Sequence, residues 1–366
     1  MPWRRREWVH ATRLCYARGL PRLAATGRKG NSQLTSEVRV QPQREDFEYD
    51  LDQALAAVVG IKAIVPADAF TAETLGTERT GSGVLIGERG HVATIGYLIT
   101  EAEKVWITLS ASRAVEGHVL GYDQETGFGL VQALARIETP HLKLGTSARA
   151  RIGDRVVVAA AGGKQRAIVA QIRAKQEFAG YWEYVLDEAL FTAPAHPTWS
   201  GTALIGPSGE LIGIGSLQLQ QQAQAGGGTA ISASAPKAGG AAIDVNMAVP
   251  IDLLKPILQD LQMFGKRQAP PRPWLGLFAT EVGERIVIAG VSGRGPARKS
   301  DVRPGDIVHS IGDIEIKSLA GFFKAIWAQG AAGVDIPMVL HRNGRTLNLH
   351  VKSTDRSRLL KGPVVH

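Results

Sequence analysis

The sequence predicts a mostly β protein built from antiparallel barrels, with a compact α+β unit at its C-terminal end. Short apolar runs recur along the 366 residues and are separated by Gly-rich turns, without the long helices that βαβ units would need. The chain has 42 glycines and only 6% aromatic residues, which favours strands joined by tight turns. Its 44% hydrophobic content is enough for a sizeable core and excludes a disordered protein, and its length suits two or three domains.

The first predicted barrel begins with a short helix that runs into a strand over residues 51–65. A Gly-rich hairpin is expected over residues 80–99, and the Val/Ile/Thr-rich residues 104–110 are typical of a strand. Two further strands are expected at residues 116–123 and 128–134. These segments together supply one barrel.

A second group of apolar runs predicts another set of strands, at residues 151–163, 167–174, 181–191, 202–217 and 245–251. The low-complexity residues 222–242 are expected to form a flexible surface loop. Residues 250–264 carry apolar side chains at helical spacing behind Asp252, which predicts an amphipathic helix with that residue as its N-cap. The charged, Pro-rich residues 265–273 predict a linker.

The C-terminal unit combines a few strands with one helix. The apolar segments at residues 274–277 and 286–318 precede a helical pattern at residues 319–329. Asn343-Gly344 then separates two strand-like runs, which is typical of a two-residue hairpin turn. The segment Asp301–Asp306 is expected to be a structural turn and not a site.

The basic charge of the chain lies in its N-terminal tail. Residues 1–44 hold ten Lys and Arg but only two acids, so they carry the whole net charge of +8. Such a tail is expected to be poorly ordered. Because the remaining residues are neutral overall, specific nucleic-acid binding is not expected, and contact of the tail with an anionic membrane or nucleic acid is a weaker alternative.

Cys15 is the only cysteine, which excludes an intramolecular disulfide and a zinc site with two or more cysteines from this chain. Nothing in the sequence suggests a metal or an organic cofactor. No apolar run reaches the ~18 residues of a membrane span. The Arg-rich start lacks the apolar core of a signal peptide, so the sequence leaves the compartment unassigned.

Several motifs, taken in their order and spacing, resemble those of the HtrA/Deg family of serine proteases over about residues 50–355. They are a GSG hairpin, the strand leading into the second barrel, the strand pair after a nucleophile, a closing strand and a PDZ-like segment, at residues 80–94, 142–163, 200–214, 245–252 and 272–318. The resemblance implies a chymotrypsin-like double six-stranded antiparallel β-barrel plus a small α+β PDZ domain. Members of the family are serine endopeptidases, and this is the activity that the resemblance implies.

The same resemblance divides the chain into five parts. They are a basic, disordered tail at 1–47, a protease-fold domain at 48–264 with barrels at about 48–148 and 149–264, a linker at 265–273, a PDZ domain at 274–355 and a tail at 356–366.

The resemblance places the positions of a catalytic triad. Ser200, in the segment HPTWSG, stands where the family has its nucleophile, while Tyr97 stands at the histidine and Gly127 at the aspartate. The spacings between these positions fit the family pattern. A serine hydroxyl without a base is a poor nucleophile at pH 7, and a neutral phenol does not replace an imidazole. His196, four residues before Ser200, is the alternative base.

The oxyanion loop is also altered. It comprises Thr198, Trp199 and Ser200, and Thr198 stands where the family has a glycine. A β-branched residue is poorly suited to unusual backbone angles, so we expect a changed loop. Asp123 and Glu125, close to Gly127 in the sequence, are expected to be solvated turn acids.

The loop that opens the PDZ-like unit resembles a carboxylate-binding loop. Its residues are Trp274, Leu275, Gly276 and Leu277. In such a loop the backbone N–H groups receive a peptide C-terminus, and the peptide adds as a strand to the sheet edge. Phe323 and Ile326, on the helix beside that groove, are either pocket residues or ordinary core.

The sequence therefore favours a non-cleaving pseudoprotease that binds peptide C-termini or unfolded proteins through its PDZ domain. The resemblance implies a homo-oligomer, a trimer or larger, or co-assembly with an active relative. The alternative is an active serine endopeptidase of protein quality control, with Ser200 and a rearranged base. A tail-mediated membrane or nucleic-acid adaptor is weaker. The family is often periplasmic or exported.

Overall fold

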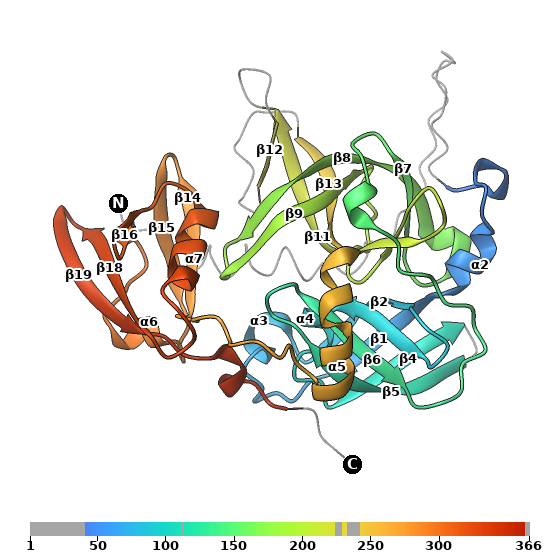
Figure 1. Cartoon of the computed structure of the whole chain (residues 1–366), viewed down its shortest axis with the longest axis horizontal. Coiled ribbons are helices and arrows are strands. Elements are labelled where there is room, and N and C mark those ends of the chain that lie inside the picture. The colour runs from blue at the N-terminus through green and yellow to red at the C-terminus, as the bar shows by residue number, and fades with distance from the viewer. Residues whose placement is uncertain (1–40, 111–112, 224–228, 233–241, 363–366) are drawn as a thin grey trace, which may run out of the picture.

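The computed structural model describes residues 41–110, 113–223, 229–232 and 242–362, and it is mostly β (Figure 1). The expectations for Cys15 and most of the basic tail fall on residues 1–40, outside the described part of the chain. Within the described residues, no helix is long and apolar enough to cross a membrane. The predicted fold class, a chymotrypsin-like pair of antiparallel barrels followed by a PDZ domain, is confirmed.

The first barrel closes with the strand order β1-β2-β3-β6-β5-β4. Its strands are β1 (Val58–Ile64), β2 (Glu78–Leu85), β3 (His91–Ile95), β4 (Lys104–Ser110), β5 (Arg113–Tyr122) and β6 (Phe128–Ala133). β4 shows the expected alternation, because Val105 and Ile107 are buried while Lys104, Trp106 and Thr108 face outward. Val105 and Ile107 belong to the main buried core.

The second barrel also closes on six strands, because β10 pairs with both β7 and β11. Its strands are β7 (Arg155–Ala159), β8 (Ala167–Gly180), β9 (Tyr184–Ala193), β10 (Ala203–Ile205), β11 (Leu211–Ala223) and β13 (Ala242–Pro250). The expectation of a loop over residues 222–242 was wrong in part. β12 (Thr229–Ser232) lies inside that segment and pairs with β11 through backbone hydrogen bonds, which need no apolar pattern.

Short helical turns precede or connect these strands. They are η1 (Arg44–Asp46), α2 (Leu51–Ala56), α3 (Ala72–Leu75), α4 (Gly96–Ile99), η2 (Ser147–Arg149) and η3 (Gly163–Arg166). The predicted helix at residues 250–264 is instead broken into η4 (Ile251–Leu253), η5 (Lys255–Ile257) and α5 (Leu258–Phe264). Pro256 lacks the N–H that an uninterrupted helix would need there. Asp252 therefore caps no long helix and instead accepts a hydrogen bond from the Ala148 N–H.

The PDZ domain contains a sheet in the order β14-β15-β16-β18-β19, with β17 paired to β16. Its elements are β14 (Leu277–Val282), β15 (Arg285–Val291), α6 (Pro296–Lys299), β16 (Ile307–Ile311), β17 (Ile314–Glu315), α7 (Leu319–Ala328), β18 (Asp335–Arg342) and β19 (Arg345–Lys352). Asn343 and Gly344 both have positive φ, as the predicted hairpin turn between β18 and β19 requires. β14 is an edge strand of this sheet.

The segments expected to be tails extend the folded part at both ends. Phe47 packs on the main core, and Asp46 forms an ion pair with Arg155 of β7. After the PDZ domain, η6 (Arg356–Leu359) is followed by Lys361, whose N–H donates to the Glu101 carboxylate of the first barrel. The expectation of tails up to residue 47 and from residue 356 was therefore wrong for these described residues, because packing, an ion pair and a hydrogen bond hold them to the barrels.

The turn Asp301–Asp306 owes its stability to a buried ion pair. Arg342 Nε lies 2.6 Å from Asp306 Oδ1, and the Asp306 side chain is only 1% exposed. We predict that Arg342→Leu lowers the free energy of unfolding of the PDZ domain by about 3–5 kcal/mol, because it leaves a buried carboxylate uncompensated. Urea unfolding of the full chain, followed by hydrogen exchange of the β16 and β18 amides, measures this. Arg303→Ala, which removes an exposed ion pair to Asp301, is the control and should cost at most about 1 kcal/mol.

Candidate functional site

Ser200 lies in a turn that is fixed between the two barrels. The Ser82 N–H of β2 donates to the Ser200 carbonyl at 2.8 Å, and the Gly201 N–H donates to the Gly215 carbonyl of β11 at 2.8 Å. Gly201 has φ +74, and a Cβ at this position would lie 1.8 Å from the Ser82 carbonyl oxygen. Only glycine fits such an approach. The sequence Ser200-Gly201 is therefore required by the backbone that presents the serine.

Tyr97 is brought directly to this serine. It lies in the short helix α4, immediately after β3, and its hydroxyl oxygen is 2.7 Å from Ser200 Oγ and 2.8 Å from the Ser216 carbonyl oxygen. A carbonyl only accepts, and a phenol has a single proton. Both contacts are satisfied together when Tyr97 donates to the Ser216 carbonyl and accepts from the Ser200 hydroxyl. The serine proton then points at a neutral oxygen.

Burial keeps Tyr97 in its neutral form. It raises the pKa of the Tyr97 phenol well above its ordinary value, and the hydrogen bond with Ser200 offsets only part of this effect. At neutral pH the phenol thus carries its own proton and has little capacity to take a second one from Ser200.

Arg79, a residue that no sequence motif indicated, holds the turn that carries Tyr97. The side chain is 4% exposed, and its Nη1 donates to the carbonyls of Tyr97 at 2.8 Å and Thr100 at 2.9 Å. Its Nη2 donates to Thr71 Oγ1, whose hydroxyl donates in turn to the Glu101 carboxylate. An arginine directly before a predicted β-hairpin gives no sequence signal for this role, because most of its partners are backbone carbonyls.

The backbone of Gly127 is hydrogen-bonded to Gly96, the residue before Tyr97. Its carbonyl accepts from the Gly96 N–H at 2.7 Å, and its φ is +84. A Cβ at this position would lie 2.9 Å from the Tyr184 hydroxyl, which donates to the Thr126 carbonyl at 2.7 Å. The backbone angle and the buried Tyr184 both disfavour a side chain here, so the position has no room for a carboxylate as it stands.

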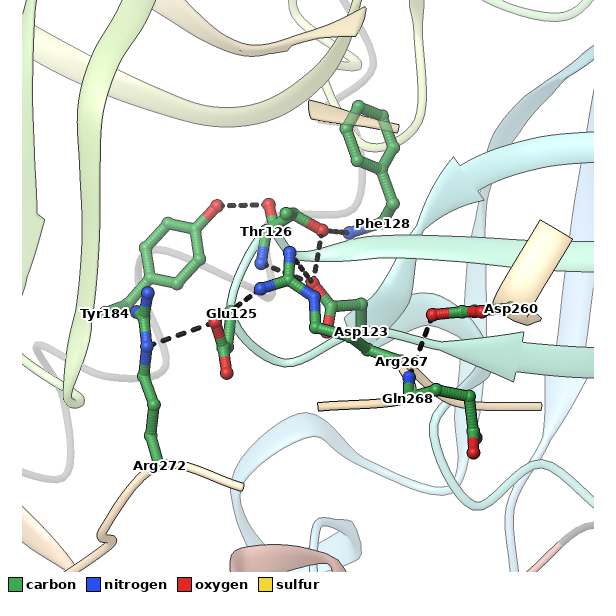
Figure 2. Close-up of polar contacts among 9 residues, drawn as sticks. All are labelled: Asp123, Glu125, Thr126, Phe128, Tyr184, Asp260, Arg267, Gln268 and Arg272. Atoms are coloured by element: carbon green, nitrogen blue, oxygen red, sulfur yellow. Dashed lines mark hydrogen bonds and ion pairs between the residues drawn. The ribbon is translucent and has the colours of Figure 1, made fainter. Parts of the chain in front are cut away.

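The acids before Gly127 are not the solvated turn residues that we expected. Asp123 is 5% exposed and accepts from the Thr126 N–H at 2.9 Å and hydroxyl at 2.8 Å. Glu125 forms ion pairs with Arg267 at 2.7 Å and Arg272 at 3.1 Å, as Figure 2 shows. Burial raises the pKa of Glu125, against the lowering effect of the two guanidinium groups. These acids anchor residues 265–273 on the first barrel.

His196 has its ring nitrogens engaged by backbone groups. Nε2 lies 3.0 Å from the Arg166 carbonyl, which can only accept, so Nε2 carries the proton in the neutral ring. Nδ1 then accepts from the Thr198 N–H at 3.0 Å. Burial lowers the pKa of His196, which favours this neutral form. The structure brings His196 to Arg166 and Thr198 and not to the Ser200 hydroxyl.

The predicted oxyanion loop is therefore internally bonded. The Thr198 N–H points to the imidazole of His196, and the Trp199 carbonyl accepts from the Thr202 N–H at 3.3 Å and hydroxyl at 3.1 Å. An oxyanion site needs N–H groups free to donate to a developing charge. The N–H at Thr198 does not meet that requirement in this conformation.

The candidate peptide loop of the PDZ domain is present but engaged. The N–H groups of Leu275, Gly276 and Leu277 donate to the side-chain carboxylate of Glu183, a residue of the second barrel. Trp274 precedes them and pairs with Thr354 through the backbone. Phe323 and Ile326 are fully buried in one cluster with Leu275 and Leu277, so both contribute to the PDZ core.

No group of three or more His, Cys, Asp or Glu side chains that could hold a metal ion occurs among the residues that the structure describes.

Two family models match the chain. Residues 81–214 match a trypsin-like peptidase domain, and residues 273–353 match a PDZ domain. The chain is 28% identical over 290 residues to the periplasmic pH-dependent serine endoprotease DegQ of Escherichia coli, covering 75% of this chain and 59% of that protein. It is 24% identical to the serine protease Do-like HtrA of Lactobacillus helveticus, covering 76% of this chain and 69% of that one.

Among solved structures, a variant of the HtrA-type protease AlgW with a tripeptide superposes with a TM-score of 0.50 at 22% identity, covering 86% of this chain and 97% of that one. This likeness concerns the fold alone. The chain spans 59% and 57% of the length of the first two curated relatives, DegQ and a DegP-like endoprotease of Hahella chejuensis.

The geometry at Gly127 gives a test of the contact with Tyr184. We predict that Gly127→Ala destabilises the protein by more than Gly153→Ala, because both residues have positive φ but only Gly127 has a neighbour within 4 Å of a Cβ. The backbone strain alone is of order 1–3 kcal/mol. Urea unfolding measures both variants. In a Tyr184→Phe background, the extra cost at Gly127 should shrink, and an unchanged cost would contradict the steric explanation.

Proposed function

We propose, from the premise that this chain has the HtrA architecture of a trypsin-like peptidase domain followed by a PDZ domain, that it is a non-cleaving member of this group. Its protease-fold domain serves as a scaffold, and its PDZ domain binds the C-termini of peptides or unfolded proteins. The observation that carries the proposal is the hydrogen-bonded position of the Tyr97 phenol against Ser200 Oγ at 2.7 Å.

The chemistry of hydrolysis supports this proposal. A serine needs a base to accept its proton when it attacks a carbonyl carbon. Tyr97, which we place at the position of the base, is neutral and donates a hydrogen bond to the Ser216 carbonyl. Loss of the serine or histidine of a triad costs roughly 10⁶ in rate in a well-studied serine protease.

Among the residues that the structure describes, those around Ser200 offer no ready replacement for the base. Gly127, which we place at the position of the orienting aspartate, has no side chain and is closed off by Tyr184. His196, the alternative base, is hydrogen-bonded to Arg166 and Thr198. The alternative of an active serine endopeptidase would need a rearrangement of both this histidine and the loop after it.

The PDZ domain supplies the binding function in this proposal. Its opening loop presents consecutive N–H groups to a carboxylate, and its edge strand β14 can accept an added strand. A homo-oligomer, a trimer or larger, or co-assembly with an active relative would place several such grooves together. That assembly is part of the proposal.

Fluorophosphonate labelling of the purified protein tests the lack of an activated serine. We expect wild type to label no faster than Ser200→Ala, and neither to cleave reduced, unfolded β-casein. An active HtrA-type endoprotease, tested in parallel, verifies the reagents. Labelling and cleavage by wild type that vanish in Ser200→Ala would overturn the proposal and show a serine endopeptidase with a rearranged base.

A further inference from the structure

We infer that the β8–β9 hairpin is an internal ligand of the PDZ groove, in which the Glu183 side-chain carboxylate occupies the place of a peptide's terminal carboxylate. The inference rests on the proposed binding of peptide C-termini by this PDZ domain. Figure 1 shows the hairpin, formed by β8 and β9, reaching from the second barrel to α7 and β14.

The carboxylate contacts are those that a peptide terminus would make. Glu183 Oε1 accepts from the N–H groups of Gly276 at 2.7 Å and Leu277 at 2.8 Å, and Oε2 accepts from Leu275 at 3.2 Å. Gly276 has φ +77, which turns these consecutive N–H groups toward a single point. Together they form an anion site built from backbone, with Glu183 as its present occupant.

The backbone of the hairpin tip also imitates a bound peptide. The Ala279 N–H of the edge strand β14 donates to the Tyr181 carbonyl at 3.0 Å. Tyr181 thus lies opposite Ala279 while Glu183 reaches Leu277, so the tip runs antiparallel to β14. A peptide that extends a PDZ sheet uses the same edge.

Side chains of the hairpin cover the other side of the groove. Val185 of β9 is 7% exposed and belongs to the same buried cluster as Phe323 and Ile326 of α7. Lys324, also on α7, forms ion pairs of 2.6 Å with Glu177 and Asp187, one on each strand of the hairpin. The hairpin therefore contacts both walls of the groove, α7 and β14.

The conformation of Glu183 has a cost that its contacts offset. Its φ is +59, a left-handed conformation that non-glycine residues adopt mainly where the surroundings impose it. Its burial raises the pKa to about 7, although three backbone N–H groups and the charge of Arg356 act in the opposite direction. A residue of such cost at a loop tip is consistent with a functional constraint.

Mutual exclusion follows from these contacts. The N–H groups of Leu275, Gly276 and Leu277 cannot hold two carboxylates at once, so a peptide binds only after Glu183 leaves. A peptide binds only those molecules in which the groove is open. The apparent affinity is therefore the affinity of the open groove multiplied by the open fraction. Weakening the Glu183 contact should therefore strengthen peptide binding.

The test uses the full chain and Glu183→Ala, with Glu183→Gln as the isosteric variant. Glu188→Gln, which changes an exposed acid of β9 whose ion-pair partner Lys175 lies on the same hairpin and not on the PDZ domain, is the matched control. The probe is a pool of fluorescein-labelled decapeptides randomised at their last four positions, made with free and with amidated C-termini. We expect both Glu183 variants to bind the free-carboxylate pool about tenfold more tightly than wild type and the control. Binding of the amidated pool should not differ among these proteins.

Hydrogen exchange of the Leu275–Leu277 amides, measured on the same proteins, separates the outcomes. We expect faster exchange of these amides in the Glu183 variants, while those of β18 and β19 stay protected. Equal binding of the pool by wild type and the variants would overturn the internal-ligand inference and leave the proposed binding function intact. If exchange accelerates but no protein binds the pool, the peptide-binding function itself fails, and the inference fails with it.

Discussion

The adjacent residues Glu183 and Tyr184 join the two halves of the molecule. Glu183 binds the PDZ loop through three N–H groups, while the hydroxyl of Tyr184 donates to Thr126, beside Gly127 in the first barrel. Both residues are buried, and they share one hairpin tip. One hairpin tip thus contacts both the PDZ loop and the residue that precedes Gly127.

At the serine site, the decisive constraint is the number of protons. An imidazole accepts a proton on one nitrogen while the other donates to a carboxylate, so it can move a proton without leaving a partner unsatisfied. Tyr97 has one hydroxyl oxygen and one hydroxyl proton, and that proton is used in the hydrogen bond to the Ser216 carbonyl. The arrangement satisfies the polar atoms of this partly buried pair, which stabilises the fold. In the proposed non-cleaving role, the same arrangement leaves Ser200 without a base.

The sequence predicted much of this fold but not its long-range contacts. The resemblance to the HtrA/Deg family implied both barrels and the PDZ domain, and it assigned Tyr97 and Ser200 to one site, where the structure brings their hydroxyls together. The break in the helix at Pro256 could have been predicted from the proline. β12 could not, because its strand pairing leaves no apolar pattern. Glu183 was also not predictable. A single acid in a turn has the signature of a solvated residue, and only the distant PDZ loop gives it partners.

The protonation state of Tyr97 is the central quantity. NMR spectra of protein labelled with ¹³Cζ-tyrosine report it directly, and Tyr97→Phe assigns the signal. If burial and the Ser216 carbonyl hold the phenol neutral, the Tyr97 signal stays unshifted up to about pH 10, the ordinary midpoint of tyrosine. A titration of this signal near neutral pH would reveal a phenolate able to accept the Ser200 proton, and it would contradict the view of this site as a protease centre without a base.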